Sequence, residues 1–445
     1  MVKDMTKGPI LSTLVKFTVP LVLGNLLQLT YNAVDSMIVG RYIGKEALAA
    51  VGTSNPMMTL VLLFTNGICL GAGILVGFHY GAKEEEILKR QVSTGMIAGI
   101  IFSLTSGALI AVLAVPILRL LHADPQILSL SAVYLRMIMA GLVFSFIYNY
   151  LASMLRAMGD SRSPLLFLGI SAVLNIAGDL LLVVAARLGT VGAALSTVLC
   201  EALSAVLCWI YIYRKIPVLR LGRGWRVFDR NLLKITLSYG IVSALQQSAV
   251  QLGKLVIQGF VNTLGVSTTA AFNATNRVDD YAIIPEQNAA HAMSSVMAQN
   301  VGAKKPDRVR KAFRYGICLE LGFGIVAGIF LYLCAAPIMR LFTSDPDVIG
   351  EGVRYLHLIA FMYPLPGLTN CIQGYFRGIG DLKVTLVCSL INIIARVVSC
   401  FIMLFVFHMR FEAIPWSYMV GWLVMIAYEV PYLIHFQRTH RFGIN

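Results

Sequence analysis

The chain has 445 residues, of which 58% are hydrophobic and only 13% are charged, and its mean hydropathy is +0.76. This composition predicts a polytopic membrane protein and argues against an enzyme with a separate aqueous catalytic domain. A net charge of +14 would suggest nucleic-acid binding in a soluble protein. Here, however, Lys and Arg concentrate in short loops between apolar runs, where they report membrane topology.

Cysteine spacing and the start of the chain give two further expectations. The eight cysteines lie singly within apolar stretches, without CxxC or Cys/His spacing, so we interpret them as core residues rather than redox or metal-binding groups. The first apolar segment exceeds the length of a signal-peptide core and lacks a small-residue cleavage site. It is expected to remain as the first transmembrane helix.

Apolar runs separated by glycine, proline and charge predict twelve transmembrane helices and therefore an all-α fold. In the first half they cover 12–38, 46–77, 92–116, 129–155, 164–186 and 190–213. In the second half they cover 232–262, 267–300, 313–337, 350–376, 382–407 and 413–436. We expect two six-helix lobes, 1–213 and 232–445, joined by a basic linker, 214–231. The distribution of Lys and Arg puts both termini and this linker in the cytoplasm, as in a protein of the cytoplasmic membrane.

The two halves are copies of one another. Shifting the sequence by 221 residues brings Gly44 onto Gly265, Gly81-Ala82-Lys83 onto Gly302-Ala303-Lys304, and Arg156-x-x-Gly159-Asp160 onto Arg377-x-x-Gly380-Asp381. We interpret the last pair as turns and headgroup anchors. Because six is an even number of spans, both lobes enter the membrane in the same direction, which predicts a pseudo-two-fold axis along the membrane normal.

Polar residues inside the first lobe mark a candidate ion site. Asp35 lies in the outer part of the first span, Asn175 and Asp179 lie one turn apart in the fifth, and Thr197 lies in the sixth. The rise of a helix puts all four at similar depth. Charged residues at that depth are costly and are usually functional. These oxygen ligands suit Na⁺, and a paired carboxylate could equally hold a proton. The alternative to an ion site is that Asp35 and Asp179 are isolated polar residues that reach the outer membrane interface.

The second lobe does not repeat this set. Asp35 falls on Val256 and Thr197 falls on Tyr418, while a four-residue shortening places Asp179 on Arg396. We therefore expect no coupling ion at the equivalent place. Polar residues instead form helical stripes that either line a substrate cleft or pair within the lobe. The cleft candidates are Gln247, Gln251, Lys254, Gln258, Asn273, Asn276, Arg277, Asp280 and Arg396.

At these residues the sequence resembles the multidrug and toxic compound extrusion (MATE) family. The resemblance covers almost the whole chain. It rests on Pro20, Asn32-x-x-Asp35, Val39-Gly40, Leu174-Asn175-x-x-x-Asp179, Gly192-Ala193-Ala194-x-x-Thr197, the two Arg-x-x-Gly-Asp runs and Gln299-Asn300-x-Gly302-Ala303. It implies export driven by a Na⁺ or H⁺ gradient, with the ion held by residues matching Asp35, Asn175, Asp179 and Thr197. One branch of the family places carboxylates in spans 7 and 10. Here those regions read Gln246-Gln247-Ser248 and Thr369-Asn370, which favours the DinF-like branch and no second ion site.

The sequence therefore predicts a secondary antiporter that exports small, amphipathic or cationic organic molecules in exchange for H⁺ or Na⁺ by alternating access. Pro20 and Gly24 supply a candidate hinge. We expect no cofactor, no nucleic-acid partner and a monomer in contact with lipid. The alternative is a flippase for an anionic, lipid-linked substrate, which Lys254, Arg277 and Arg396 would suit. A membrane enzyme lacks support because HExxH and GxSxG are absent from the sequence, and a channel lacks a filter-like sequence.

Overall fold

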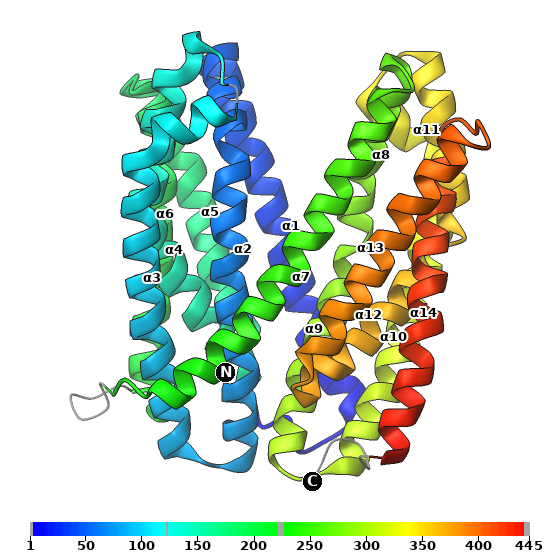
Figure 1. Ribbon diagram of the computed structural model, residues 1–445. Coiled ribbons are helices and arrows are strands. Elements are labelled where there is room, and N and C mark those ends of the chain that lie inside the picture. The colour runs from blue at the N-terminus through cyan, green and yellow to red at the C-terminus, as the bar shows by residue number, and fades with distance from the viewer. Residues whose placement is uncertain (1–2, 122, 221–226, 440–445) are drawn as a thin grey trace. The chain divides into compact units, whose positions relative to one another are not determined.

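A computed structural model describes residues 3–121, 123–220 and 227–439, which contain helices and no strands (Figure 1). In the first half the helices are α1 (Ile10–Tyr42), α2 (Lys45–Ala82), α3 (Glu85–Leu120), α4 (Pro125–Ala157), α5 (Arg162–Asp179) with its π-helical continuation η1 (Leu180–Ala185), α6 (Gly189–Lys215) and the short 3₁₀ helix η2 (Pro217–Leu219). In the second half they are α7 (Arg230–Asn262), α8 (Val266–Ala282), α9 (Ile284–Gly302), α10 (Pro306–Phe342), α11 (Pro346–Ala360), α12 (Pro364–Ile379), α13 (Leu382–Phe405) and α14 (Ala413–Thr439).

These helices give the twelve predicted spans, although the second lobe contains two broken ones. Within the described ranges, nine helices are long and apolar enough to cross a membrane. The other three spans are the polar-striped α7, the pair α8 and α9, and the pair α11 and α12. The breaks precede Pro285 and Pro364. Proline cannot donate a backbone hydrogen bond and clashes with the preceding turn. The first lobe has Phe64 and Val143 at the equivalent positions, so α2 and α4 run through.

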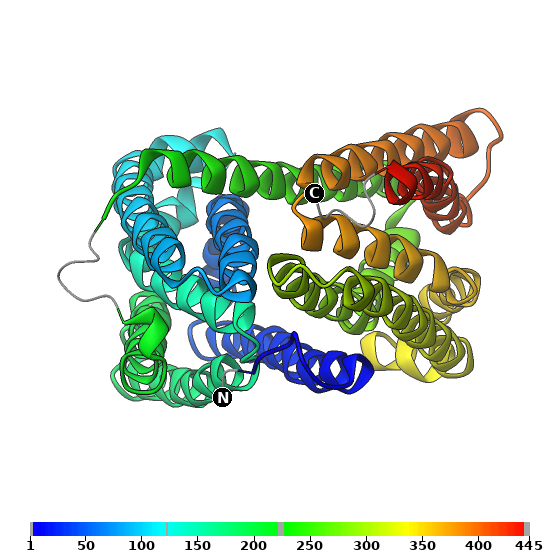
Figure 2. The same ribbon diagram turned by 90° about the horizontal axis from the view of Figure 1, so that it is seen from below.

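The chain forms two packed units, and each is a helical bundle, as the end-on view of Figure 2 illustrates. One unit contains the chain up to Asp4 and Val19–Ala244, and the other contains Met5–Thr18 and Leu245–Asn445. Part of the predicted linker, 221–226, lies outside the described residues. The boundary between the two packed units lies within α7, after Ala244, and not in the 214–231 loop. The units also divide α1 between Thr18 and Val19, immediately before Pro20.

Backbone conformation confirms the internal repeat. Four pairs of residues with positive φ are separated by the same 221 residues: Gly44 (117°) with Gly265 (105°), Lys83 (59°) with Lys304 (55°), Gly159 (85°) with Gly380 (91°), and Arg187 (52°) with His408 (50°). Positive φ is uncommon for residues with a side chain. The copies have therefore kept the same interhelical turns as well as the same sequence pattern.

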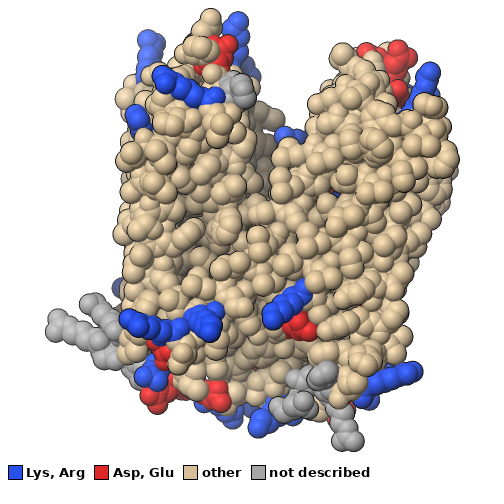
Figure 3. Space-filling model, in the orientation of Figure 1, with Lys and Arg blue, Asp and Glu red and all other residues tan. Residues whose placement is uncertain are grey.

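The outer surface of each unit suits lipid. Large apolar side chains are exposed along the long helices, for example Val112 at 75% and Leu333 at 72%. On the face in Figure 3, Lys, Arg, Asp and Glu lie mainly toward the ends of the helices, and the surface between them is largely uncharged. This distribution matches a hydrocarbon band with polar groups at both interfaces.

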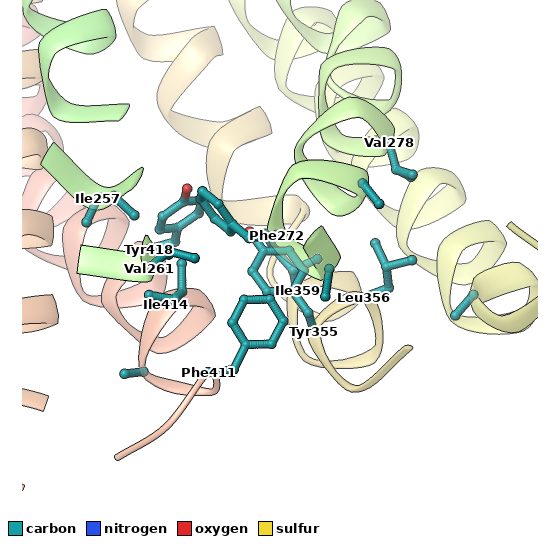
Figure 4. Close-up of a cluster of buried hydrophobic side chains, with 14 of the residues drawn as sticks. Ile257, Val261, Phe272, Val278, Tyr355, Leu356, Ile359, Phe411, Ile414 and Tyr418 are labelled. Carbon is teal, nitrogen blue, oxygen red and sulfur yellow. The ribbon is translucent and has the colours of Figure 1, made fainter. Parts of the chain in front are cut away.

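An aromatic cluster forms much of the core of the second lobe (Figure 4). Tyr355 on α11 stacks on Phe411 with ring centroids 5.3 Å apart, and Phe272 on α8 contacts both rings edge-on. Tyr418 on α14 belongs to the same cluster. Such offset and edge-to-face pairs stabilise a core beyond their apolar area.

Candidate functional site

The structure brings together Asp35 on α1 and Asp179 on α5, which the helical rise placed at similar depth. Their carboxyl groups lie within hydrogen-bonding reach of one another. Asp179 is fully buried, and neither of its oxygens has a hydrogen-bond donor among the described residues. One oxygen of Asp35 is also buried without a donor. Because unpaired buried carboxylates are costly, this pair requires a proton or a cation.

A change of helix type positions Asp179. It is the last α-helical residue of α5, and the π-helical segment η1 follows directly. A π-helical turn holds an extra residue, which rotates the side chains after it, and such turns occur often at functional sites. The sequence predicted this span as a regular helix, because its proline, Pro164, lies at the start of the span, far from the π-helical turn.

Asn175 binds Ser196 on α6, and not Thr197, which the sequence had suggested for the site. Its Nδ2 donates to Ser196 Oγ on α6 at 3.0 Å, and Ser196 Oγ donates to the backbone oxygen of Asn175 at 3.0 Å. Thr197 donates to Ala193 O of its own helix at 3.1 Å. Ser196 also contacts Asp179. The α6 hydroxyl at the centre of the site is thus Ser196, which the sequence reasoning missed.

Two other polar residues near the aspartates were missed. Tyr134 on α4 is buried and interacts electrostatically with Asp35, Asp179 and Glu201. Glu201 on α6 accepts a hydrogen bond from Ser145 at 3.0 Å. Glu201 follows Thr197 by four residues in an apolar span. An intramembrane carboxylate on the same helix face was therefore a signal that could have found it.

The surroundings of the pair are apolar. Val39 of α1, Ala193 and Ala194 of α6 and Val183 of η1 are almost fully buried around Tyr134. The donor set within this shell consists of carboxylate, carboxamide and hydroxyl oxygens. These are hard ligands that suit Na⁺, and the two adjacent carboxyl groups can equally share a proton.

At the equivalent place in the second lobe the chemistry is reversed. Arg396 on α13 lies over the ring of Tyr418, with its guanidinium carbon 3.1 Å from the ring centroid. Asp279 on α8 accepts hydrogen bonds from Tyr355 at 3.3 Å and Tyr363 at 2.5 Å. The guanidinium of Arg396 thus lies where the first lobe has the carboxylate of Asp179, as the shifted alignment suggested.

The polar stripes of α7 and α8 are both exposed and partly paired. Lys254 Nζ lies 3.2 Å from Asp280 Oδ1, and the two side chains remain 46% and 38% exposed. Gln258 donates to Asn262 at 2.9 Å. Gln251, Asn273 and Arg277 are exposed, whereas Gln247 and Asn276 are half-buried. Within the described part of the chain, Arg277 has no carboxylate in ion-pair distance.

The Arg-x-x-Gly-Asp runs form turns, and in the first run the charged side chains contact groups inside the lobe. Asp160 is almost completely buried and caps the start of α5, because its carboxylate accepts hydrogen bonds from Ser163 N at 3.1 Å, Ser163 Oγ at 2.8 Å and Tyr211 at 2.9 Å. Burial opposes its ionisation, and these hydrogen bonds outweigh burial, so the pKa of Asp160 is lowered. Arg156 interacts with Tyr148, Cys69 and Cys208 inside the lobe.

These features define a multi-pass helical membrane protein with two six-span bundles and an acidic pair inside the first of them. Comparison with known proteins identifies the family: the MatE family model matches residues 20–181 and 243–402, and the chain belongs to that family. Its members are transporters and not enzymes.

Two curated relatives and a solved structure agree with this assignment. The chain is 31% identical to the probable multidrug resistance protein YoeA of Bacillus subtilis over 82% of this chain and 80% of that protein. It is 30% identical to the probable multidrug resistance protein YpnP of the same organism, over 87% of each. A crystal structure of a MATE protein in the bent conformation shares the fold, with a TM-score of 0.91, 21% identity and 98% coverage of both chains.

Proposed function

We propose that the chain is a secondary antiporter that exports small, amphipathic or cationic organic molecules in exchange for H⁺ or Na⁺. The observation that carries this proposal is the pair Asp35 and Asp179, whose carboxyl groups lie within hydrogen-bonding reach of one another and have three buried oxygens without a hydrogen-bond partner among the described residues. Binding and release of a cation at such a pair changes the charge of the first lobe. That change can favour one conformation of a transporter over another.

The names of the relatives support the substrate class. Both Bacillus proteins are described as probable multidrug resistance proteins. Exposed amide side chains on α7 and α8, such as Gln251 and Asn273, provide polar contacts without selecting one charge. We propose that these residues contact the substrate. We also propose that the chain belongs to the DinF-like branch and lies in the cytoplasmic membrane with both termini inside the cell.

The alternative, a flippase for an anionic lipid-linked substrate, loses two of its three supporting residues. Lys254 is neutralised by Asp280, and Arg396 is stacked on Tyr418. Among the described residues, Arg277 is the one of the three that has neither a carboxylate at ion-pair distance nor an aromatic ring beneath it. The residues that the sequence offered for an anionic headgroup are therefore mostly engaged within their own lobe.

Reconstitution in liposomes tests the proposal. Efflux of a fluorescent cationic dye would be followed after imposing a Na⁺ gradient at equal pH and, separately, a pH gradient without Na⁺. We expect one of the two gradients to drive efflux against the dye gradient. Transport that ignores both gradients, or translocation of a labelled anionic lipid without either gradient, would contradict the proposal. The work available is about 2.3 kcal/mol for each charge moved across 100 mV.

A further inference from the structure

A second buried acidic group lies within the second lobe. Glu286 in the first turn of α9 is fully buried, and Glu320 in the middle of α10 is 1% exposed. The two glutamates interact with one another electrostatically. All four of their carboxyl oxygens are buried without a hydrogen-bond partner among the described residues.

Glycines make the space that the Glu286 carboxyl fills. A Cβ atom at Gly324 on α10 would lie 3.0 Å from Glu286 Oε1 and 2.8 Å from the backbone oxygen of Tyr363. A Cβ at Gly367 on α12 would lie 2.9 Å from the backbone oxygen of Glu320 and 3.6 Å from Glu286 Cδ. The carboxyl group thus lies in a slot that side chains at these two positions would narrow or close.

The internal repeat fills the equivalent volume of the first lobe without carboxyl groups. At the equivalent positions the first lobe has Thr65 for Glu286, Gly99 for Glu320 and Phe146 for Gly367. There the Phe146 ring packs directly on Gly99, 1.7 Å from where its Cβ would be. The second lobe therefore has Gly367 in place of the Phe146 ring, and the side chains of Glu286 and Glu320 occupy this region instead. Packing alone does not explain acids there, since the other copy folds with apolar contact.

The charges around the pair do not balance. Arg377 on α12 interacts with Glu320 and with a third buried glutamate, Glu429 on α14, and Nε of Arg377 has no hydrogen-bond partner. Glu429 also has two buried oxygens without a partner. Cys371 lies near Glu320, and Tyr363 lies near Glu286. Three glutamates and one arginine would leave two uncompensated anions in a low-dielectric interior, which is costly.

We propose that Glu286 and Glu320 form a proton-binding site that takes up one exchangeable proton beside Arg377. The proton comes from the aqueous phase and forms an O–H bond on one carboxylate, and its release restores the anion. A proton satisfies the pair without the additional oxygen ligands that Na⁺ needs. The fixed positive charge of Arg377 opposes a metal cation at short range. The sequence expectation of no ion site in this lobe concerned spans 7 and 10, whereas this site uses spans 8 and 9.

That the proton is used in transport rests on the proposed antiport, whereas proton binding itself does not. Binding itself can be measured on the purified full-length protein by infrared difference spectroscopy of the protonated carboxyl stretch as pH is changed. We expect a pH-dependent signal that the double variant Glu286→Gln with Glu320→Gln loses. Asp35→Asn with Asp179→Asn should leave this component in place. Glu412→Gln, which changes an exposed carboxylate, is the matched control.

Three results would overturn the site. One is an unchanged pH-dependent signal in the double glutamine variant. Another is a carboxyl signal that never changes with pH, which would mean that the glutamates are permanently neutral. A third is loss of the protonated signal when Na⁺ is added at constant pH, which would mean a metal site. If the glutamine variant does not fold, Glu286→Thr with Glu320→Gly and Gly367→Phe, which rebuilds the first-lobe packing, must lose the same component. A failed efflux assay with an intact infrared result would reject antiport alone.

Discussion

The guanidinium of Arg396 lies over the ring of Tyr418, at positions that the internal repeat aligns with Asp179 and Thr197 of the first lobe. Two of the arginine nitrogens, Nε and Nη2, are buried and have no hydrogen-bond partner. The aromatic face is therefore a main source of stabilisation for this charge. At this position of the fold, the first lobe has a pair of carboxylates and the second lobe has the positively charged side chain of Arg396.

Replacing Arg396 by Lys should destabilise the protein although the charge is kept. Lysine cannot present a flat guanidinium to the ring, and cation–π contacts contribute about 0.5–2 kcal/mol. We expect a loss of that size in the free energy of unfolding, measured by thermal or denaturant unfolding in detergent. Arg354→Lys is the control, because Arg354 is 70% exposed in its pair with Glu412. Equal effects of the two substitutions would refute the stacking argument.

Asp35→Asn and Asp179→Asn should each uncouple transport from the ion gradient. Removing one carboxylate leaves too little negative charge to hold the ion, and we expect at least about a tenfold loss of gradient-driven efflux, equivalent to about 1.4 kcal/mol. Membrane insertion and melting temperature should stay close to those of the wild type. Asp307→Asn, at an exposed position in the first turn of α10, is the control. Normal coupling in both variants would reject the assignment.

Gly178→Ala should disturb the same site without removing any polar group. A Cβ at this position would lie 2.6 Å from Ser196 Oγ, which is too close, so Ser196 must move away from Asn175. Overpacking of this kind costs about 1–3 kcal/mol. We expect a lower melting temperature together with weaker ion dependence of efflux. Gly52→Ala in the same lobe should change neither, since its Cβ would meet nothing within 4 Å.

Pro20→Ala should slow the transport cycle while leaving ion binding intact. Helix α1 changes from one packed unit to the other between Thr18 and Val19, and Pro20 removes a backbone hydrogen bond just beyond this point. Alanine would restore that hydrogen bond and stiffen the junction. Turnover in proteoliposomes should fall, with unchanged ion affinity by calorimetry. Pro116→Ala, inside α3, is the matched control, and an equal loss of turnover there would remove the case for a hinge.

Asp160→Asn should destabilise the protein at neutral pH and have less effect in acid. The pKa of Asp160 is lowered in the folded state, so its contribution is complete above the ordinary aspartate pKa of about 3.9 and is lost as pH falls through the folded value. The three hydrogen bonds to the carboxylate suggest about 1–3 kcal/mol at neutral pH. Melting curves of both proteins at several pH values measure this. A difference that grows on acidification would contradict the sign.

Much of the architecture could be predicted from the sequence because its signals are local or periodic. Apolar length predicted twelve spans, and the 221-residue repeat, which the paired left-handed turns confirm, predicted two similar halves. The breaks before Pro285 and Pro364 were not predicted, although proline chemistry explains them. Helical rise alone was enough to bring Asp35 and Asp179 to one depth, and their contact follows from packing α1 against α5.

What the sequence by itself determined is the order of the spans, the duplication and the depth of the acidic residues, since each depends only on position along a helix. The tertiary structure decided which side chains interact: Ser196 instead of Thr197 beside Asn175, Arg396 over Tyr418, and Glu286 with Glu320 through their charges. Those contacts depend on how each helix is rotated about its axis and on the volume that its neighbours leave. The π-helical turn after Asp179 changes the rotation of its helix, and the glycine at position 367 changes the available volume.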